Sequence, residues 1–185
     1  RQRHLTIPCE MCIRDSGDLL FREHLVDAQK FAEKITREIG DTKPLPHLDL
    51  LLELNGFRLH GRLATLWPER MLRYRCAKMK AKDQLKAWIE HLVLNVLQEP
   101  DYPCQTLLLM TDRSVLFSPV EEPEEILQAV LELYWQGLSR PLPFFPESAL
   151  AYASAKPPWD IGKALGKWSD GYHDLPGEGS DRYFR

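Results

Sequence analysis

The chain has 185 residues, 44% of them hydrophobic, so its length and composition fit one domain with a single buried core. Its formal net charge of -3 excludes a global positive field and restricts any nucleic-acid contact to a local patch. It contains no apolar run long enough to span a membrane and no secretory pattern at its N-terminus, so we predict a soluble cytoplasmic protein with reduced cysteines.

Residues 1–16 show neither helical nor strand periodicity and do not lead into the pattern that follows. Met11 to Ser16 also resembles peptides translated from sequencing-adapter DNA. We therefore predict that residues 1–16 are a non-native segment and that one domain covers residues 17–185. The chain stops at Arg185 without a terminating pattern, which predicts that the native C-terminus is missing.

Cys9 and Cys12 form the only Cys-x-x-Cys pair of the sequence, which is the spacing of half a zinc site. A zinc site of this kind needs a second pair, whereas Cys76 and Cys104 stand alone. We therefore predict no metal site.

The first predicted elements are a helix and a set of strands. Apolar residues recur at three and four from Leu19 to Ile39, which predicts an amphipathic helix with Gly40 as its C-cap. Residues 48–54 and 57–66 alternate around the turn dipeptide Asn55-Gly56, which predicts a β-hairpin. Residues 71–76 are a third strand candidate, so the segment is interpreted as an antiparallel meander.

Further helices and a second hairpin follow. A wide apolar stripe predicts a helix over residues 82–98, and residues 105–110 and 114–118 flank a turn. Pro123 opens a helix that extends to residue 138. Three prolines predict an extended segment over residues 138–148, before a short helix over residues 148–155. The fold class is α/β (α+β), an antiparallel meander flanked by helices.

Two positions match the places where compact α/β nucleases carry the ligands of Mg²⁺, with Gly-x-x-Asp on one strand and Asp/Glu-x-Lys on the next. Here Gly61-Arg-Leu-Ala64 ends in alanine, and Arg73-Tyr-Arg75 has arginine in place of both the acid and the lysine. Alanine offers no ligand and arginine repels a cation. Ala64, Arg73 and Arg75 are therefore interpreted as a degenerate, inactive site. The alternative is that they are ordinary strand residues.

Other polar residues have plainer interpretations. Asp49 and Glu53 fit a solvated strand face and Asp112 fits a turn, although a working Mg²⁺ nuclease would have to use them. His91, next to Glu90, is interpreted as a hydrogen-bonded structural histidine. The sequence contains neither a Ser/His/Asp pattern nor a phosphate-binding loop.

Positive charge is concentrated in one stretch that also contains aromatic residues. This composition suits a patch that follows a DNA backbone and stacks on bases. The alternative is a set of solvated strand faces. The DNA-binding candidates are Arg58, Arg62, Trp67, Arg70, Arg73, Tyr74, Arg75, Lys78 and Lys80.

Several motifs resemble, in order, the C-terminal region of the RecC family, and the resemblance spans residues 17–185. They are Gly61-Arg-Leu, Leu72-Arg-Tyr-Arg75, Trp88-Ile-Glu-His-Leu-Val93, the segment from Tyr134 to Ser148, and Gly177-Glu-Gly-Ser-Asp181 with Tyr183. The Trp-x-Glu-His-Leu-Val and Gly-Leu-x-x-Pro-Leu elements are fairly specific when taken together.

The resemblance implies a domain related to the PD-(D/E)XK nucleases that lacks their active site. It also implies membership of the bacterial RecBCD complex (exodeoxyribonuclease V), with RecB and RecD as partners. That complex processes double-strand DNA ends for recombinational repair. No cofactor is expected in this domain, since ATP and Mg²⁺ are used by the partner subunits. Chi recognition is expected upstream of this fragment. A purely structural docking domain, contacting a partner through Leu142 to Phe145, remains the alternative.

Overall fold

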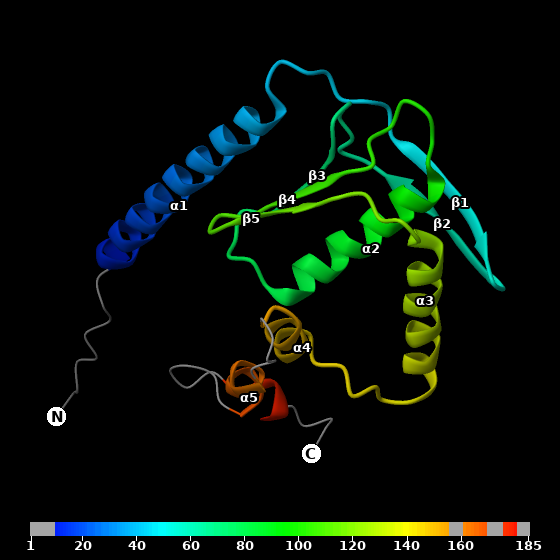
Figure 1. Ribbon diagram of the computed structural model, residues 1–185. Helices are drawn as coiled ribbons and strands as arrows, with labels where there is room; N and C mark the ends of the chain where they lie inside the picture. The colour runs from blue at the N-terminus through cyan, green and yellow to red at the C-terminus, as the bar shows by residue number, and fades with distance from the viewer. Residues whose placement is uncertain (1–9, 156–160, 170–175, 181–185) are drawn as a thin grey trace. The chain divides into compact units, whose positions relative to one another are not determined.

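The computed structural model describes residues 10–155, 161–169 and 176–180, with side chains from Gly17 onward (Figure 1). The chain divides into two compact units, residues 1–42 and residues 43–185. In the described parts, no helix is long and apolar enough to cross a membrane.

The first unit contains one helix, α1 (Glu10–Ile39). Gly40 has a φ of 60° and donates its N–H to the carbonyl of Thr36 at 2.9 Å, which is the left-handed C-cap that favours glycine. The predicted end of the helix is therefore confirmed. The predicted start near Leu19 is wrong, because residues 10–16 contain no proline or glycine and a nucleated helix needs no apolar stripe to continue. The non-native origin of residues 1–16 stays a prediction.

The second unit begins with the predicted hairpin. Strands β1 (Leu48–Leu54) and β2 (Phe57–Leu63) are antiparallel, and their register pairs Leu48 with Leu63. Asn55 and Gly56 both have positive φ, which a tight hairpin turn requires. Alternate residues of β1 point towards the core, as the sequence predicts.

The next strands form a second sheet, which corrects the predicted meander. β3 (Met71–Tyr74) pairs in parallel with β4 (Thr106–Leu109), and β4 pairs antiparallel with β5 (Ser114–Phe117). Towards the hairpin, β3 makes one isolated antiparallel bridge, between Leu66 and Met71. Thr65, with a φ of 60°, interrupts the strand geometry there. All four residues of β4 are buried, as expected of a central strand.

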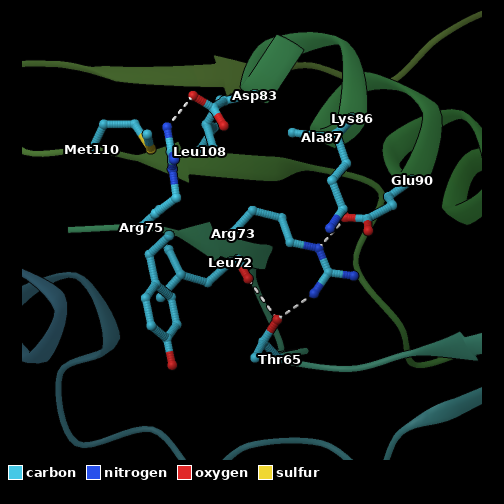
Figure 2. Close-up of a pocket in the computed structure, with 11 residues that line it drawn as sticks. Thr65, Leu72, Arg73, Arg75, Asp83, Lys86, Ala87, Glu90, Leu108 and Met110 are labelled. Atoms are coloured by element: carbon cyan, nitrogen blue, oxygen red, sulfur yellow. Dashed lines mark hydrogen bonds and ion pairs between the residues drawn. The ribbon is translucent and has the colours of Figure 1, made fainter. Parts of the chain in front are cut away.

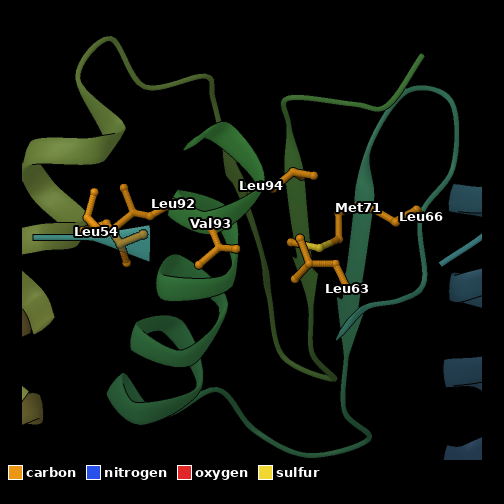
Figure 3. Close-up of a cluster of buried hydrophobic side chains, with 8 residues drawn as sticks. Leu54, Leu63, Leu66, Met71, Leu92, Val93 and Leu94 are labelled. Carbon is orange, nitrogen blue, oxygen red and sulfur yellow. The ribbon is translucent and has the colours of Figure 1, made fainter. Parts of the chain in front are cut away.

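Helix α2 (Ala81–Leu97) forms the crossover between the parallel strands β3 and β4. It begins and ends within one residue of the prediction. Its buried face meets the hairpin, β3 and helix α3 (Pro123–Ser139) in the main core (Figure 3). The buried core residues are Leu54, Leu63, Leu66, Met71, Leu92, Val93, Leu94 and Leu127. Full burial of each leucine contributes about 2 kcal/mol.

The C-terminal part holds α4 (Pro146–Ala153), α5 (Ile161–Ser169) and a 3₁₀ turn, η1 (Glu178–Ser180). Helix α4 starts two residues before the predicted position, because Pro146 occupies the first helical turn, where its missing N–H costs nothing. No helix was predicted over α5, although its apolar residues recur at three and four. The carboxylate of Glu178 accepts hydrogen bonds from the backbone N–H groups of Glu147 and Ser148, at 2.9 and 2.8 Å. Glu178 therefore caps α4.

Candidate nucleic-acid interface between β3 and α2

A pocket lies between β3 and the first half of α2, and both arginines of the predicted degenerate site line it (Figure 2). Side chains two residues apart on an extended chain share one face, so Arg73 of β3 and Arg75 just after it both face the helix. Residues three and seven apart on a helix also share a face, which brings together Asp83, Lys86 and Glu90 of α2. Leu72, Ala87, Leu108 and Met110 supply the apolar lining.

Arg73 makes a set of contacts that hold it in place. Its guanidinium forms an ion pair with the carboxylate of Glu90. It also donates hydrogen bonds to the carbonyl of Ala64 at 3.2 Å and to the hydroxyl of Thr65 at 2.9 Å. The Thr65 hydroxyl in turn donates to the carbonyl of Leu72 at 2.5 Å. Two of the three predicted degenerate positions, Ala64 and Arg73, are therefore in direct contact.

Arg75 forms a similar ion pair with a carboxylate nearer the start of α2. Its guanidinium donates to the carboxylate of Asp83 at 2.6 Å. Asp83 also accepts a hydrogen bond from the backbone N–H of Lys80 at 3.0 Å, so the same carboxylate caps α2. A carboxylate near a helix N-terminus is stabilised by the helix dipole. The Arg75–Asp83 pair therefore joins β3 to the start of α2.

The chemistry of this pocket follows from its charges. Two arginines are matched by two carboxylates, and Lys86 contributes one further positive charge. A carboxylate that pairs with arginine is a poor ligand for a cation, because the guanidinium repels the metal. Among the described residues, no three His, Cys, Asp or Glu side chains are placed to hold a metal ion. The charged groups of the lining, two arginines and Lys86 against Asp83 and Glu90, leave a formal charge of +1.

The remaining DNA-binding candidates lie on other elements. Cross-strand partners face two of them on the hairpin, where Arg58 pairs with Glu53 and Arg62 pairs with Asp49, each at 2.9 Å. Arg70 contacts Glu69 at 3.1 Å in the turn before β3. The two hairpin arginines and Arg70 are therefore not part of the lining of the β3–α2 pocket.

The aromatic and lysine candidates differ in exposure. Tyr74 is exposed and lines the pocket, whereas Trp67 is half-buried in the turn after β2. Lys78 and Lys80 are exposed in the link between β3 and α2. This link is held by Asp112, which accepts the backbone N–H of Met79 at 2.8 Å.

The acids considered as alternative metal ligands have structural roles. Asp49 and Glu53 face the arginines directly opposite them in the β1–β2 register. The hydrogen bond from Met79 holds the pKa of Asp112 below its usual value, and Arg113 and Lys78 act in the same direction. Asp112 lies in the turn between β4 and β5, as predicted.

His91 is a buried structural histidine, as predicted. Its Nε2 donates to the carbonyl of Ser118 at 3.0 Å, so its Nδ1 accepts from the Thr106 hydroxyl at 2.9 Å. Asn95 continues the network by donating to the carbonyls of His91 and Cys104. Burial lowers the pKa of His91, and the hydrogen bond to Ser118 opposes that effect only in part.

The structure describes the side chains of two of the four cysteines. Cys76 and Cys104 are both free and exposed. Cys9 and the side chain of Cys12 lie outside the described residues, so the Cys-x-x-Cys pair is not described.

Sequence reasoning missed Asp83 and Lys86, and it named Glu90 only as the neighbour of His91. These three residues lie three and seven positions apart on the polar side of a predicted helix. That spacing was the available signal, but the helix had to be placed beside β3 before it could be connected with Arg73 and Arg75.

The structure is thus a mixed α/β domain with a pocket between β3 and α2 in which both arginines are ion-paired. A model of the RecC C-terminal domain family matches residues 12–157. The chain therefore belongs to the RecC C-terminal domain family, which confirms the resemblance found in its motifs. It is similar to the RecBCD enzyme subunit RecC of Escherichia coli (strain K12), with 26% identity over 138 residues, or 74% of this chain. The match covers 12% of that relative, so the chain spans a small part of its length.

Proposed function

We propose that this domain is a noncatalytic DNA-binding and scaffolding part of a RecBCD-type helicase–nuclease, the complex also called exodeoxyribonuclease V. Such a complex processes double-strand DNA ends for recombinational repair, with RecB and RecD as partner subunits. ATP and Mg²⁺ belong to those partners. The domain itself is related to the PD-(D/E)XK nucleases and has a degenerate site at Ala64, Arg73 and Arg75. Family membership supports the assignment to such a complex.

One observation carries the noncatalytic part of the proposal: Arg73 and Arg75 are ion-paired with Glu90 and Asp83. A nuclease site in this place would need free carboxylates converging on a metal ion. The two acids that face the pocket instead neutralise two arginines. An active Mg²⁺ nuclease that used Asp49, Glu53 or Asp112 would need three of their oxygens near one point, and each of these acids has another partner.

The DNA-binding part rests on the cations around the same pocket. Lys78, Lys80 and Lys86 are exposed. The exposed side chain of Tyr74 lines the same pocket as Lys86. Lysine ammonium groups bind phosphates as point charges, and an exposed aromatic ring provides a platform for an unpaired base. We infer contact with the backbone at a duplex end, where unpaired bases become available.

A direct test replaces exposed lysines, because reversing the charge of Arg73 or Arg75 would also break the ion pairs that join β3 to α2. The Lys78→Ala/Lys80→Ala variant is compared with Lys43→Ala/Lys163→Ala, which removes two exposed lysines elsewhere. Binding to a fluorescent duplex with a short fork is measured by anisotropy from 50 to 300 mM salt. We expect weaker binding, and a slope of log affinity against log salt reduced by about 2, only in the first variant. Equal slopes in both variants would contradict the proposed surface.

The second candidate function is a purely structural docking domain without DNA contact. It is favoured by the pairing of Arg58, Arg62, Arg73 and Arg75 with carboxylates, which leaves these arginines with little charge to offer. The salt titration separates the two functions, because a docking domain shows absent or salt-insensitive DNA binding. Release of nucleotides by the isolated chain with Mg²⁺ would contradict both.

A further inference from the structure

The last three described elements, α4, α5 and η1, pack against one another around a tryptophan. The indole of Trp168 in α5 meets the ring of Phe145 edge-on at 4.3 Å. It also lies so close to η1 that a Cβ on Gly179 would come within 2.6 Å of it. The carboxylate of Glu178 in η1 accepts the backbone N–H of Glu147 in α4. Both α5 and η1 are therefore tied to the first turn of α4.

These three elements contribute no buried side chain. No residue of α4, α5 or η1 is buried, whereas the buried residues of the main core lie between Leu54 and Leu127. In the described chain after α3, the buried residues are Ala155, just after α4, and Gly177, just before η1. Regions with few buried apolar contacts open at a lower free energy than the core of the same protein.

Helix α4 is attached to the start of α2 through a carboxylate. Oε1 of Glu147 accepts the N–H of Ala81 at 2.8 Å, which satisfies one of the donors that the first turn of α2 leaves free. Figure 1 shows α4 beside the start of α2, with α5 next to α4 on the side away from α2.

The apolar part of this attachment is incomplete. An apolar pocket of about 300 Å³ remains between α4, α2 and β5, although protein interiors are otherwise close-packed. Its lining includes Leu85 and Trp88 of α2, Phe117 of β5, and Ala149, Leu150 and Ala153 of α4.

The chain between α3 and α4 contacts α3 before Phe144 and α5 after it. A Cβ on Gly137 would lie 3.2 Å from the side chain of Leu142, so Leu142 is in close contact with α3. Phe145 packs against Trp168 of α5. Phe144 lies between these two anchored residues and is 49% exposed. A rotation of the backbone at Phe144 therefore moves α4 and leaves the contact with α3 in place.

We infer that α4, α5 and η1 form a lid that opens from α2 as one unit, with its hinge at Phe144, while the main core stays folded. The open state uncovers the N–H of Ala81 and the apolar side chains of Leu85 and Trp88. Lys80 of the proposed DNA surface directly precedes Ala81, so the lid controls the start of α2 beside that surface. The lid itself does not depend on the proposed function.

The test follows amide hydrogen exchange by mass spectrometry in the full-length protein that contains this domain. After correction for intrinsic rates, we expect the amides of α4 and α5 to exchange at least about tenfold faster than those of α2 and β4. Glu147→Ala removes the acceptor of the Ala81 N–H. Exchange should rise by about fivefold, the usual effect of losing a helix cap, and by the same factor in α4 and α5. No residue of α5 takes part in the lost bond, so this equality is the signature of one opening unit.

The matched control is Glu124→Ala. Glu124 occupies the same place in α3 as Glu147 does in α4, directly after the proline that opens the helix. This variant should leave exchange in α4 and α5 unchanged. Faster exchange in Glu147→Ala that is confined to Ala81 and the first turn of α4 would show local fraying and overturn the lid. Wild-type exchange in α4 and α5 as slow as in α2 and β4 would also overturn it, because these helices would then open only with the whole domain.

A second variant acts in the opposite direction. Ala153→Met places a flexible side chain in the pocket between α4, α2 and β5, which strengthens the closed state. We expect exchange to slow by about threefold in both α4 and α5, with no change in α2 and β4. Slower exchange in α4 alone would contradict a lid that opens as one unit.

Discussion

The guanidinium of Arg73 forms an ion pair with the carboxylate of Glu90, two helical turns after Asp83, the acid that binds Arg75. Both pairs join the short strand β3 to the same side of α2. The side chains of Arg73 and Glu90 are only 22% and 25% exposed, so their charges are poorly solvated without each other. Arg73 and Arg75, which we propose to occupy the place of nuclease ligands, therefore serve to hold a strand to a helix.

Removal of one member of this pair is expected to destabilise the fold. In Arg73→Met the carboxylate of Glu90 remains, largely buried and without its guanidinium, and we expect a loss of about 1–3 kcal/mol in the free energy of unfolding. In Arg73→Met/Glu90→Leu neither charge remains, so the loss should be smaller than the sum of the single losses by about 1 kcal/mol. Urea unfolding of the wild type, Arg73→Met, Glu90→Leu and the double variant measures this coupling energy.

The matched control is the pair between Arg58 and Glu53, whose side chains are both 70% exposed. The same set of substitutions there should give a coupling energy under about 1 kcal/mol. Equal coupling for the two pairs would show that burial adds nothing to the Arg73–Glu90 interaction.

Leu127 and Leu138 lie on the same stripe of α3 but differ in exposure, at 0% and 62%. Leu127→Ala removes a fully buried side chain and should cost about 3 kcal/mol of unfolding free energy. Leu138→Ala should cost under about 1 kcal/mol in the isolated chain, because little apolar surface is lost there. Chemical unfolding followed by circular dichroism compares them. A large loss in Leu138→Ala would mean that Leu138 is covered within the chain itself.

Acid should weaken the packing of α2 against β4 through His91. Because burial lowers the pKa of His91 in the folded state, the unfolded chain binds a proton more readily. The contribution of His91 is therefore fully present above the unfolded pKa of about 6.5 and decreases as the pH falls below it. Unfolding free energies at pH 7.5 and 5.5 should show this loss.

The His91→Gln variant provides the control for this pH effect. Glutamine does not titrate, so the difference in stability between pH 7.5 and 5.5 should shrink. The variant should also be less stable at pH 7.5 by about 1–3 kcal/mol, because the groups of Thr106 and Ser118 lose well-placed partners. An unchanged pH difference would assign the acid sensitivity to other groups.

Local patterns predicted the elements of the fold better than they predicted its strand pairing. The Asn55-Gly56 turn and the alternation around it fixed the β1–β2 hairpin, since both partners are adjacent in sequence. Periodicity could not show that β3 pairs with β4 rather than with β2, because the pairing spans the whole of α2. The continuous apolar run of β4 was a sign of a strand buried on both faces.

Only the arginines of the candidate site could be predicted from the sequence. Arg73 and Arg75 stood out because their spacing matches the Asp/Glu-x-Lys pattern of nucleases, with arginine at both positions. Their partners Glu90 and Asp83 are helix residues, and only the packing of α2 against β3 brings them close. Helix α5 was missed because it is short and contains Gly162 and Gly166, although Ile161, Leu165 and Trp168 recur at helical spacing. Its stability comes from contacts such as that between Trp168 and Phe145, whose ring centroids lie 4.3 Å apart.

The segment from Gly177 to Ser180 contacts both α4 and α5. A Cβ on Gly179 would lie 2.6 Å from the indole of Trp168, and one on Gly177 would lie 2.5 Å from the carbonyl of the same residue. Gly179→Ala should therefore displace Glu178 from the start of α4. We expect faster amide hydrogen exchange at Glu147 and Ser148, which donate to Glu178.

Glu178→Gln tests the cap, since glutamine retains the shape of the side chain but lacks its charge and one of its two acceptor oxygens. Burial raises the pKa of Glu178, but hydrogen bonds from Ser148 and Glu147 outweigh it, so the folded pKa lies below the ordinary value of 4.5. The cap therefore contributes stability above pH 4.5 that is lost as the pH falls through the folded pKa. Exchange at the two amides should rise on acidification in the wild type, relative to α2 amides, after correction for the intrinsic pH dependence of exchange. In Glu178→Gln it should already be raised at pH 7 and should respond little to acid, whereas wild-type protection there would show that Glu178 does not hold α4.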